Sequence, residues 1–243
     1  MKTSSVTHKA HTRVSVNVQL REYFIKVYRF MSLGLVVSAV CAFLGAHQPL
    51  LGWLYSTNVE GMATLSLLGW IVLLAPFALV FKLYSDVKNL KYSTAVWTFG
   101  VFSALMGLSL SSIFLVYAPG TIFTTFLICA VMFGSLSLYG QTTQRDLTSL
   151  GSILGMGVWG LLIAIIVNIF MHSAALDFTI SIVGVGIFTG LIAYDTQRIL
   201  HLYDRSTSTQ ALNSIAVIAA LTLYLDFVNL FLFLLRLFAR QRR

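Results

Sequence analysis

Long apolar runs joined by short polar connections dominate the pattern along the chain. Six stretches of at least 17 residues contain no Asp, Glu, Lys or Arg, and about 20 apolar residues cross a bilayer as a helix. These stretches are Phe30–Ala46, Met62–Phe81, Thr94–Tyr117, Gly120–Tyr139, Leu147–Met171 and Phe178–Tyr194. A seventh, Ala211–Leu235, contains one charged residue, Asp226. The runs are continuous, whereas the strands of a membrane β-barrel alternate in polarity over shorter segments.

The pattern therefore predicts an all-α, polytopic membrane protein, a bundle of seven transmembrane helices over residues 30–238. A polar, basic tail precedes it at residues 1–29, and a short basic tail follows at 239–243. The composition agrees: 58% of the 243 residues are hydrophobic and 10% are charged, against about 25% charged in soluble domains.

The positive charges predict the orientation, because cytoplasmic loops collect Lys and Arg. With the N-terminus in the cytoplasm, the tail and the loops on that side hold twelve of these cations as far as Arg205. The opposite loops, His47–Gly61, Ala118–Pro119 and His172–Asp177, hold none. This asymmetry explains the net charge of +8 by topology and contact with anionic lipid, and it argues against nucleic-acid binding.

One feature conflicts with this orientation. Seven spans place Arg236, Arg240, Arg242 and Arg243 on the outer side, against the positive-inside rule. Either the last span crosses and the earlier helices override its basic end, or it dips in and returns. We expect it to cross, because 25 residues are ample for a full span.

Small residues line two of the spans. Gly151, Gly155, Gly157 and Gly160 lie in the fifth, and Gly184, Gly186 and Gly190 lie in the sixth. Glycine lets helices approach closely in lipid, so we interpret these residues as packing contacts rather than as a gate.

Two acidic residues within the spans are the candidate functional groups. A carboxylate there costs about 2.5–3.5 kcal/mol on insertion scales and usually faces a cavity or a partner. Asp226 shares a helical face with Thr222 and Asn229. Asp195 lies at the inner end of the sixth span, where an interfacial pair with Arg198 is the alternative to a functional role.

The depths of the two aspartates predict that they meet. If the sixth helix continues through residues 199–203 and the last one enters the hydrocarbon near Val217, Asp195 and Asp226 are about equally buried, at roughly 14 Å. Two adjacent carboxyl groups in a low dielectric do not both ionise easily, so they share one proton. Such a pair latches two helices when singly protonated, repels when fully ionised, and attracts a hard cation such as calcium.

Three stretches carry a resemblance to a known family. They are residues 139–147 (YGQTTQRDL), 190–199 (GLIAYDTQRI) and 221–231 (LTLYLDFVNLF). The sequence resembles the Bax-inhibitor-one family, also called the transmembrane Bax inhibitor motif family, in its bacterial branch. The second stretch resembles the tyrosine-aspartate-threonine signature of that family, and the match in layout runs from about residue 22 to 240.

The resemblance implies seven helices with the last one central, and a pH-sensitive calcium leak controlled by a di-aspartyl pair that corresponds to Asp195 and Asp226. Some bacterial members pair these aspartates with an arginine of helix two. This chain has no Arg in that span, so the latch lacks its counter-charge or uses Lys82 or Arg198. Arg145 and Asp146 match a family motif at the turn after the fourth helix, where the resemblance implies a structural role.

Other functions fit less well. A retinal protein needs a lysine in its last helix, and no Lys follows Lys91. An intramembrane aspartyl protease also places two aspartates on successive helices, but its Gly-x-Gly and Pro-Ala-Leu motifs do not occur around Asp226. The alternative that stays open is a non-conducting interaction protein, because some bacterial relatives are described as modulators of a membrane quality-control protease.

The sequence thus predicts a multi-pass protein of the bacterial inner membrane that is not an enzyme and needs no cofactor. Its expected function is a proton-regulated calcium leak, with calcium as the permeant ion. Asp195 and Asp226 form the expected sensor and a transient calcium site, supported by Lys82, Arg198, Thr222 and Asn229. The expected partners are the lipid bilayer, calcium, protons and, in the alternative, a membrane protease.

Overall fold

A computed structural model describes the backbone of residues 3–57, 63–85, 91–204 and 209–240, and the side chains of 18–56, 64–83, 91–203 and 212–238. The long helices in these ranges are α1 (Thr3–Gly45), α3 (Leu67–Ser85), α4 (Tyr92–Ser109), α6 (Pro119–Thr142), α7 (Thr148–Met171), α8 (Ala174–Asp204) and α9 (Thr209–Arg240). The short elements are α2 (Leu50–Leu54), α5 (Ser112–Val116), β1 (Tyr55–Thr57) and β2 (Ala63–Leu65).

Six of the described helical segments are long and apolar enough to cross a membrane. They lie in α1, α4 with α5, α6, α7, α8 and α9. The apolar part of α3, Leu67–Leu83, has 17 residues and falls just below that length. The six spans agree with the sequence prediction, and the predicted count of seven depends on α3.

The predicted second span begins too early. Residues Ala63–Leu65 pair with Tyr55–Thr57 as an antiparallel hairpin, and the helix begins only at Leu67. A charge-free window does not distinguish an apolar strand from the start of a helix, which explains the error. The fold is otherwise helical throughout the described residues, as predicted.

The first helix is longer than its predicted span. α1 begins within the segment assigned to the basic tail and runs without a break to Gly45. Tyr23, Phe24 and Val27 are buried in the bundle, so packing begins before the charge-free run at Phe30. The cations of this segment leave enough apolar positions on one face to contact the other helices.

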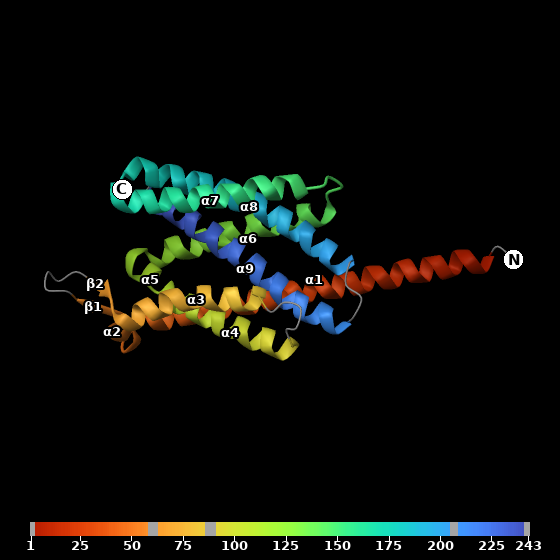
Figure 1. Cartoon of the computed structure of the whole chain (residues 1–243), viewed down its shortest axis with the longest axis horizontal. Coiled ribbons are helices and arrows are strands. Elements are labelled where there is room, and N and C mark those ends of the chain that lie inside the picture. Colours follow the sequence, from red (N-terminus) through yellow and green to blue (C-terminus); the bar gives the residue numbers. More distant parts are fainter. Residues whose placement is uncertain (1–2, 58–62, 86–90, 205–208, 241–243) are drawn as a thin grey trace.

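The bundle consists of two groups of helices with α9 in contact with both (Figure 1). α1 packs against α4, and α4 against α3, on one side; α6 and α7 pack against α8 on the other. α9 contacts α1 and α4 from the first group and α6 and α8 from the second. Over an apolar stretch of 18 residues, 67% of the residues of α9 are buried, compared with 6% for such a stretch of α7.

The α1–α4–α9 junction has a buried polar centre. The Ser38 hydroxyl donates to the Ser103 carbonyl at 2.7 Å and accepts from the Tyr224 hydroxyl at 2.7 Å. Tyr224 is fully buried, with Phe99 and Phe102 packed edge-on against its ring. Each polar atom of this centre therefore has a partner, as burial in an apolar core requires.

The predicted packing role of glycine holds for some positions. A Cβ on Gly151, Gly184 or Gly190 would lie 2.3–2.7 Å from a side chain of a neighbouring helix, so these helices approach closely. Gly155, Gly160 and Gly186 have nothing within 4 Å of that position and do not serve as contacts between the described helices.

Candidate functional site

The two aspartates occupy adjacent helices deep in the fold. α8 continues without a break to Asp204, as the depth estimate required, so Asp195 lies inside the helix rather than at its end. Asp226 lies in the middle of α9, and the two helices pack along much of their length. Asp195 is 7% exposed and Asp226 is 6% exposed.

The carboxyl groups of Asp195 and Asp226 lie close enough to interact across the α8–α9 interface. A carboxylate has no proton to donate, so the two groups can form a hydrogen bond with each other only when one of them is protonated. One oxygen of Asp226, Oδ2, is buried and has no hydrogen-bond partner among the described residues. The arrangement is therefore a pair of acids that can share a proton, next to an acceptor that has no partner in this part of the structure.

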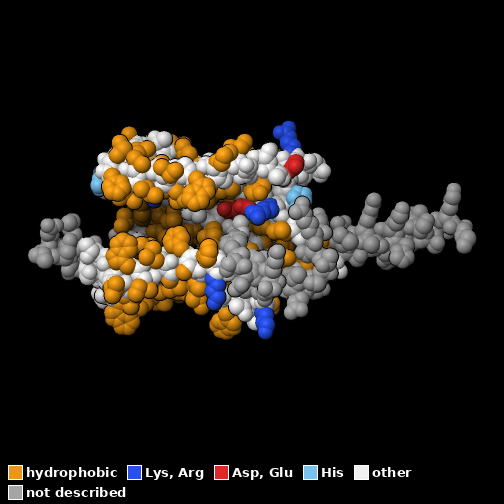
Figure 2. Space-filling model, viewed as in Figure 1, with side chains coloured by type: hydrophobic (Ala, Val, Ile, Leu, Met, Phe, Trp, Pro, Cys, Tyr) orange, Lys and Arg blue, Asp and Glu red, His pale blue; other side chains and the backbone are white. Residues whose placement is uncertain are grey.

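Arg198 is the cation that reaches this pair. Its Nη1 lies 3.8 Å from Oδ1 of Asp195, one turn away on the same helix, and its side chain is 61% exposed. This is longer than the 2.7–2.9 Å of a tight charge-assisted hydrogen bond. A pocket of about 150 Å³ between α8 and α9 is lined by Asp195, Arg198 and Thr222 together with apolar side chains. Figure 2 shows acidic and basic side chains side by side in a hollow between two apolar bands.

The other predicted supporting residues have different positions. Thr222 donates to the Ile218 carbonyl of its own helix at 3.2 Å and also lines the pocket. Asn229 donates to the Leu225 carbonyl of its own helix at 2.9 Å. Lys82 is exposed near the end of α3, a helix that packs against α4 rather than against α8 or α9.

One turn of α8 connects four other parts of the fold. Asp195 contacts Asp226 of α9, and the Thr196 hydroxyl lies 3.1 Å from that of Ser137 on α6. Gln197 accepts from the Leu147 amide and donates to the Arg145 carbonyl, both at 2.8 Å. The Tyr194 ring fills the space beside Gly151 of α7. Successive helical residues point about 100° apart, so four in a row reach four neighbours.

Sequence reasoning did not find the polar chain that continues from Thr196. The Ser137 hydroxyl also contacts the Tyr28 hydroxyl of α1, and Gln141 donates to Tyr28 at 2.7 Å. Ser137 and Gln141 are four residues apart, so they share a face of α6. This spacing of two polar residues within an apolar span was the feature of the sequence that could have indicated the polar chain.

The donors at the site match a weak site for a hard cation rather than a closed metal centre. In the described part of the chain, no three His, Cys, Asp or Glu side chains come together to hold a metal ion. Two carboxyl groups alone supply at most four of the six to eight oxygen ligands that calcium takes.

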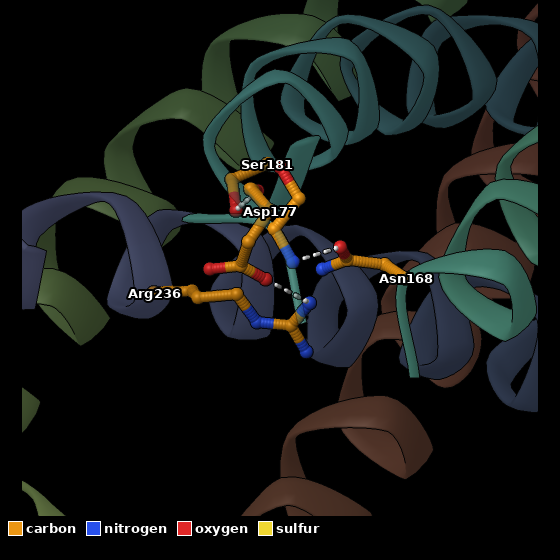
Figure 3. Close-up of polar contacts among 5 residues, drawn as sticks. Asn168, Asp177, Ser181 and Arg236 are labelled. Atoms are coloured by element: carbon orange, nitrogen blue, oxygen red, sulfur yellow. Dashed lines mark hydrogen bonds and ion pairs between the residues drawn. The ribbon is translucent and has the colours of Figure 1, made fainter. Parts of the chain in front are cut away.

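A polar cluster fixes the opposite end of α9, as Figure 3 shows. Arg236 lies 3.7 Å from Asp177 at the start of α8, and its guanidinium stacks on the Phe233 ring. The α7–α8 turn is closed by Asn168, which accepts from the Ser173 amide at 3.1 Å, and within α8 Ser181 donates to the Asp177 carbonyl at 2.8 Å. α9 thus runs as one helix to the end of the bundle marked by the α7–α8 turn, as expected for a helix that crosses.

Comparison with known proteins identifies the family of this chain. The family model described as "Inhibitor of apoptosis-promoting Bax1" matches residues 20–243. The chain belongs to the Bax inhibitor-1 family. Its relatives include the inner membrane protein YbhL of Escherichia coli, 40% identical over 92% of this chain and 93% of that protein. An uncharacterized protein of Borreliella burgdorferi is 44% identical over 91% of this chain and 93% of its own length.

Membership confirms the family resemblance, and with the six apolar spans it identifies an integral membrane protein. The matched region begins at residue 20, close to Tyr23, where α1 enters the packed bundle. The three stretches that carried the resemblance are also neighbours in space. Residues 139–147 contain the turn that Gln197 holds, and the other two contain Asp195 and Asp226.

Proposed function

We propose that this protein of the Bax inhibitor-1 family is a pH-sensitive calcium leak whose gate is the Asp195–Asp226 pair. The observation that carries the proposal is the close approach of two buried carboxyl groups on neighbouring helices. Burying two carboxyl groups at this depth costs free energy, and acidic residues within membrane spans usually have a function. The number of protons that the pair holds changes the force between the two helices that carry it.

The pair acts as a latch in this proposal. With one shared proton, the hydrogen bond holds α8 against α9. With both groups ionised, like charges a few ångströms apart repel, and the cost of separating them is lowest along the pocket that already opens beside Asp195. Arg198, at the mouth of this pocket, provides the counter-charge for the ionised Asp195.

Calcium is the proposed permeant ion because the candidate ligands of the pair are oxygen atoms. A hard cation prefers carboxylate oxygens, and Asp226 Oδ2 is an acceptor without a partner in the described structure. Two carboxyl groups bind such an ion weakly, which suits a path that an ion must leave as well as enter.

We also propose that the protein lies in the bacterial inner membrane with its N-terminus in the cytoplasm. The name of the relative from Escherichia coli supports the location. The twelve Lys and Arg residues of the tail and of alternate loops support the orientation. The one described cation at the outer end of α9, Arg236, is paired with Asp177, which lowers the cost of placing it there.

Calcium flux into proteoliposomes tests the gate. We expect flux through the wild type to change with pH between about pH 5 and about pH 8, where a shared carboxyl proton is exchanged. Asp195→Asn and Asp226→Asn should each flatten this profile, because an amide neither ionises nor shares a proton. The matched control is Asp177→Asn, an acidic residue on the same helix that pairs with Arg236.

The control should keep the wild-type profile. An unchanged pH response in both pair variants rejects the sensor assignment, and absence of flux in the wild type at every pH rejects the leak.

A non-conducting interaction protein is the second candidate. The observation that favours it is the N-terminal part of α1, which is helical from Thr3 and projects well beyond the other helices (Figure 1). Its sequence carries Lys9 and Arg13, so a partner such as a membrane quality-control protease would meet a basic helix. Deletion of residues 3–17 should abolish regulation of the partner and leave any calcium flux of the full-length protein unchanged. Loss of flux in this variant contradicts a separate role for the extension.

A further inference from the structure

A second polar region lies beside the Asp195–Asp226 pair, at the end of the bundle where α6 and α8 end and α7 begins. Two adjoining hollows of about 550 Å³ and 270 Å³ share Thr148, Gln197 and His201 in their walls. The larger one is also lined by Arg145 and the smaller one by Arg198. Figure 2 shows basic, acidic and histidine side chains at this end of the α7–α8 layer.

The charges of this region favour an anion. Arg145 and Arg198 provide two guanidinium groups, and the exposed His201 adds ring nitrogens that can donate hydrogen bonds. The one acid among the lining residues, Asp146, already accepts a hydrogen bond from the Thr148 amide at 2.9 Å. Hydrogen bonds from the Thr148 side chain and amide hold the pKa of the Asp146 carboxyl below its usual range, so it is one negative charge beside the two guanidinium groups.

The backbone at Arg145 is braced although its side chain is exposed. Gln197 donates to the Arg145 carbonyl, and the Arg145 amide donates to the Thr143 hydroxyl at 3.3 Å. The structure gives its guanidinium no ion pair among the described residues. Because the backbone at Arg145 is already fixed, less conformational entropy is lost when its guanidinium binds a ligand.

The position of the hollows indicates which anion reaches them. α7 exposes large apolar side chains one to two turns beyond this end, including Ile153 and Met156. Such surfaces of a membrane protein face acyl chains, so the polar hollows lie at the level of the lipid headgroups. Arginine suits a phosphate group because its planar donors bind two oxygens at once.

We propose that Arg145 and Arg198 bind the phosphate of an anionic phospholipid, and that this lipid competes with Asp195 for Arg198. The loose 3.8 Å contact and the 61% exposure of Arg198 leave its guanidinium able to turn toward a phosphate. The competition rests on the proposed function, since it changes the charge beside the gate. The binding site itself does not depend on that function.

Native mass spectrometry of the full-length protein tests the site. Phosphatidylglycerol and phosphatidylcholine with the same acyl chains are the probes. We expect the wild type to retain the anionic lipid preferentially and Arg145→Gln to lose about fivefold in that preference, the effect of one cation beside an anionic lipid. Arg145→Lys should keep most of it. The control Arg29→Gln removes an equally exposed charge from α1 and should lose less.

Equal losses in Arg145→Gln and Arg29→Gln would overturn the proposal, because they indicate general surface attraction. Displacement of the lipid by an equal concentration of inorganic phosphate would also overturn it, since the site would then belong to a free anion. Failure of the leak leaves this measurement intact, because binding is read without flux.

The competition has its own readout. The flux midpoint in vesicles that contain phosphatidylglycerol should differ from that in pure phosphatidylcholine vesicles, and the difference should be smaller in Arg145→Gln than in the wild type or Arg29→Gln. All variants share the effect of the surface charge on local pH. Identical differences in the three proteins would reject the competition, while the mass-spectrometric result would still decide the site.

Discussion

Among single residues, the smallest ones set how close the helices lie around the site. A Cβ on Gly140 of α6 would lie 2.4 Å from the backbone carbonyl oxygen of Ala193, which is two residues before Asp195. A backbone atom does not move aside as the end of a flexible side chain does. Gly140 therefore fixes the distance between α6 and α8, and with it the contact of Ser137 with Thr196.

Gly140→Ala should destabilise the protein by about 1–3 kcal/mol, the usual cost of forcing an extra methyl group into a packed site. Thermal unfolding in detergent, followed by circular dichroism, measures the change. Gly134→Ala on the same helix is the matched control, because nothing lies within 4 Å of its Cβ position. The control should be neutral or stabilising by up to about 1 kcal/mol, from the better helix propensity of alanine. Equal unfolding midpoints would show that the two helices adjust freely at Gly140.

The residues of the site differ in how far the sequence could predict them. Asp195 and Asp226 were predictable because a charge in an apolar run is rare and costly. The bonds of Thr222 and Asn229 to their own backbones were not, since a shared helical face does not say which side chains turn back. Tyr28 and Ser137 come from helices more than 100 residues apart, and no local pattern contains the register that joins them.

At the level of elements, the turn between α6 and α7 is held by a side chain from α8 in addition to hydrogen bonds within its own sequence. The α6–α7 turn at residues 143–147 contains no Gly or Pro, and its shape depends on Gln197, which binds it at both the Arg145 carbonyl and the Leu147 amide. Leu147 is buried, so its amide has no access to water if that partner is lost.

Gln197→Leu should therefore cost about 1–3 kcal/mol, the penalty of leaving a buried backbone donor unpaired. Amide hydrogen exchange, read by mass spectrometry, should show faster exchange at Leu147 and across the turn. Gln144→Leu, an exposed residue of the same turn, is the control and should leave exchange at Leu147 unchanged. Unaltered exchange in Gln197→Leu would mean that the turn keeps its shape without the brace.

The boundaries of the elements could be predicted from hydrophobicity at some positions and not at others. The sequence located α6 and α7 closely, because both are charge-free runs ended by polar turns. It missed the β1–β2 hairpin and the early start of α1 packing. The start of α1 packing is decided by neighbours distant in sequence, α4, α8 or α9, whereas the hairpin is decided by pairing with a strand at most ten residues away.

In the whole molecule, the chain termini and the connections between helices gather at two opposite ends of the bundle. The N-terminus and the α6–α7 turn lie at one end, and the hairpin, the α7–α8 turn and the C-terminus lie at the other (Figure 1). The Asp177–Arg236 pair belongs to this second end. Both side chains are partly exposed, so the pair adds at most about 1 kcal/mol to stability, and its main effect is to neutralise the charge of Arg236.

This arrangement makes the orientation testable by cysteine labelling in intact cells and in inverted vesicles. In a background with Cys41 and Cys129 replaced by Ala, a membrane-impermeant thiol reagent should label Arg145→Cys only in inverted vesicles. His172→Cys and Arg236→Cys should react only in intact cells, because α7, α8 and α9 each cross between the two ends. If Arg236→Cys reacts from the same side as Arg145→Cys, α9 returns instead of crossing. In that case the positive-inside rule holds for the tail, and the Asp177–Arg236 contact does not form in the membrane.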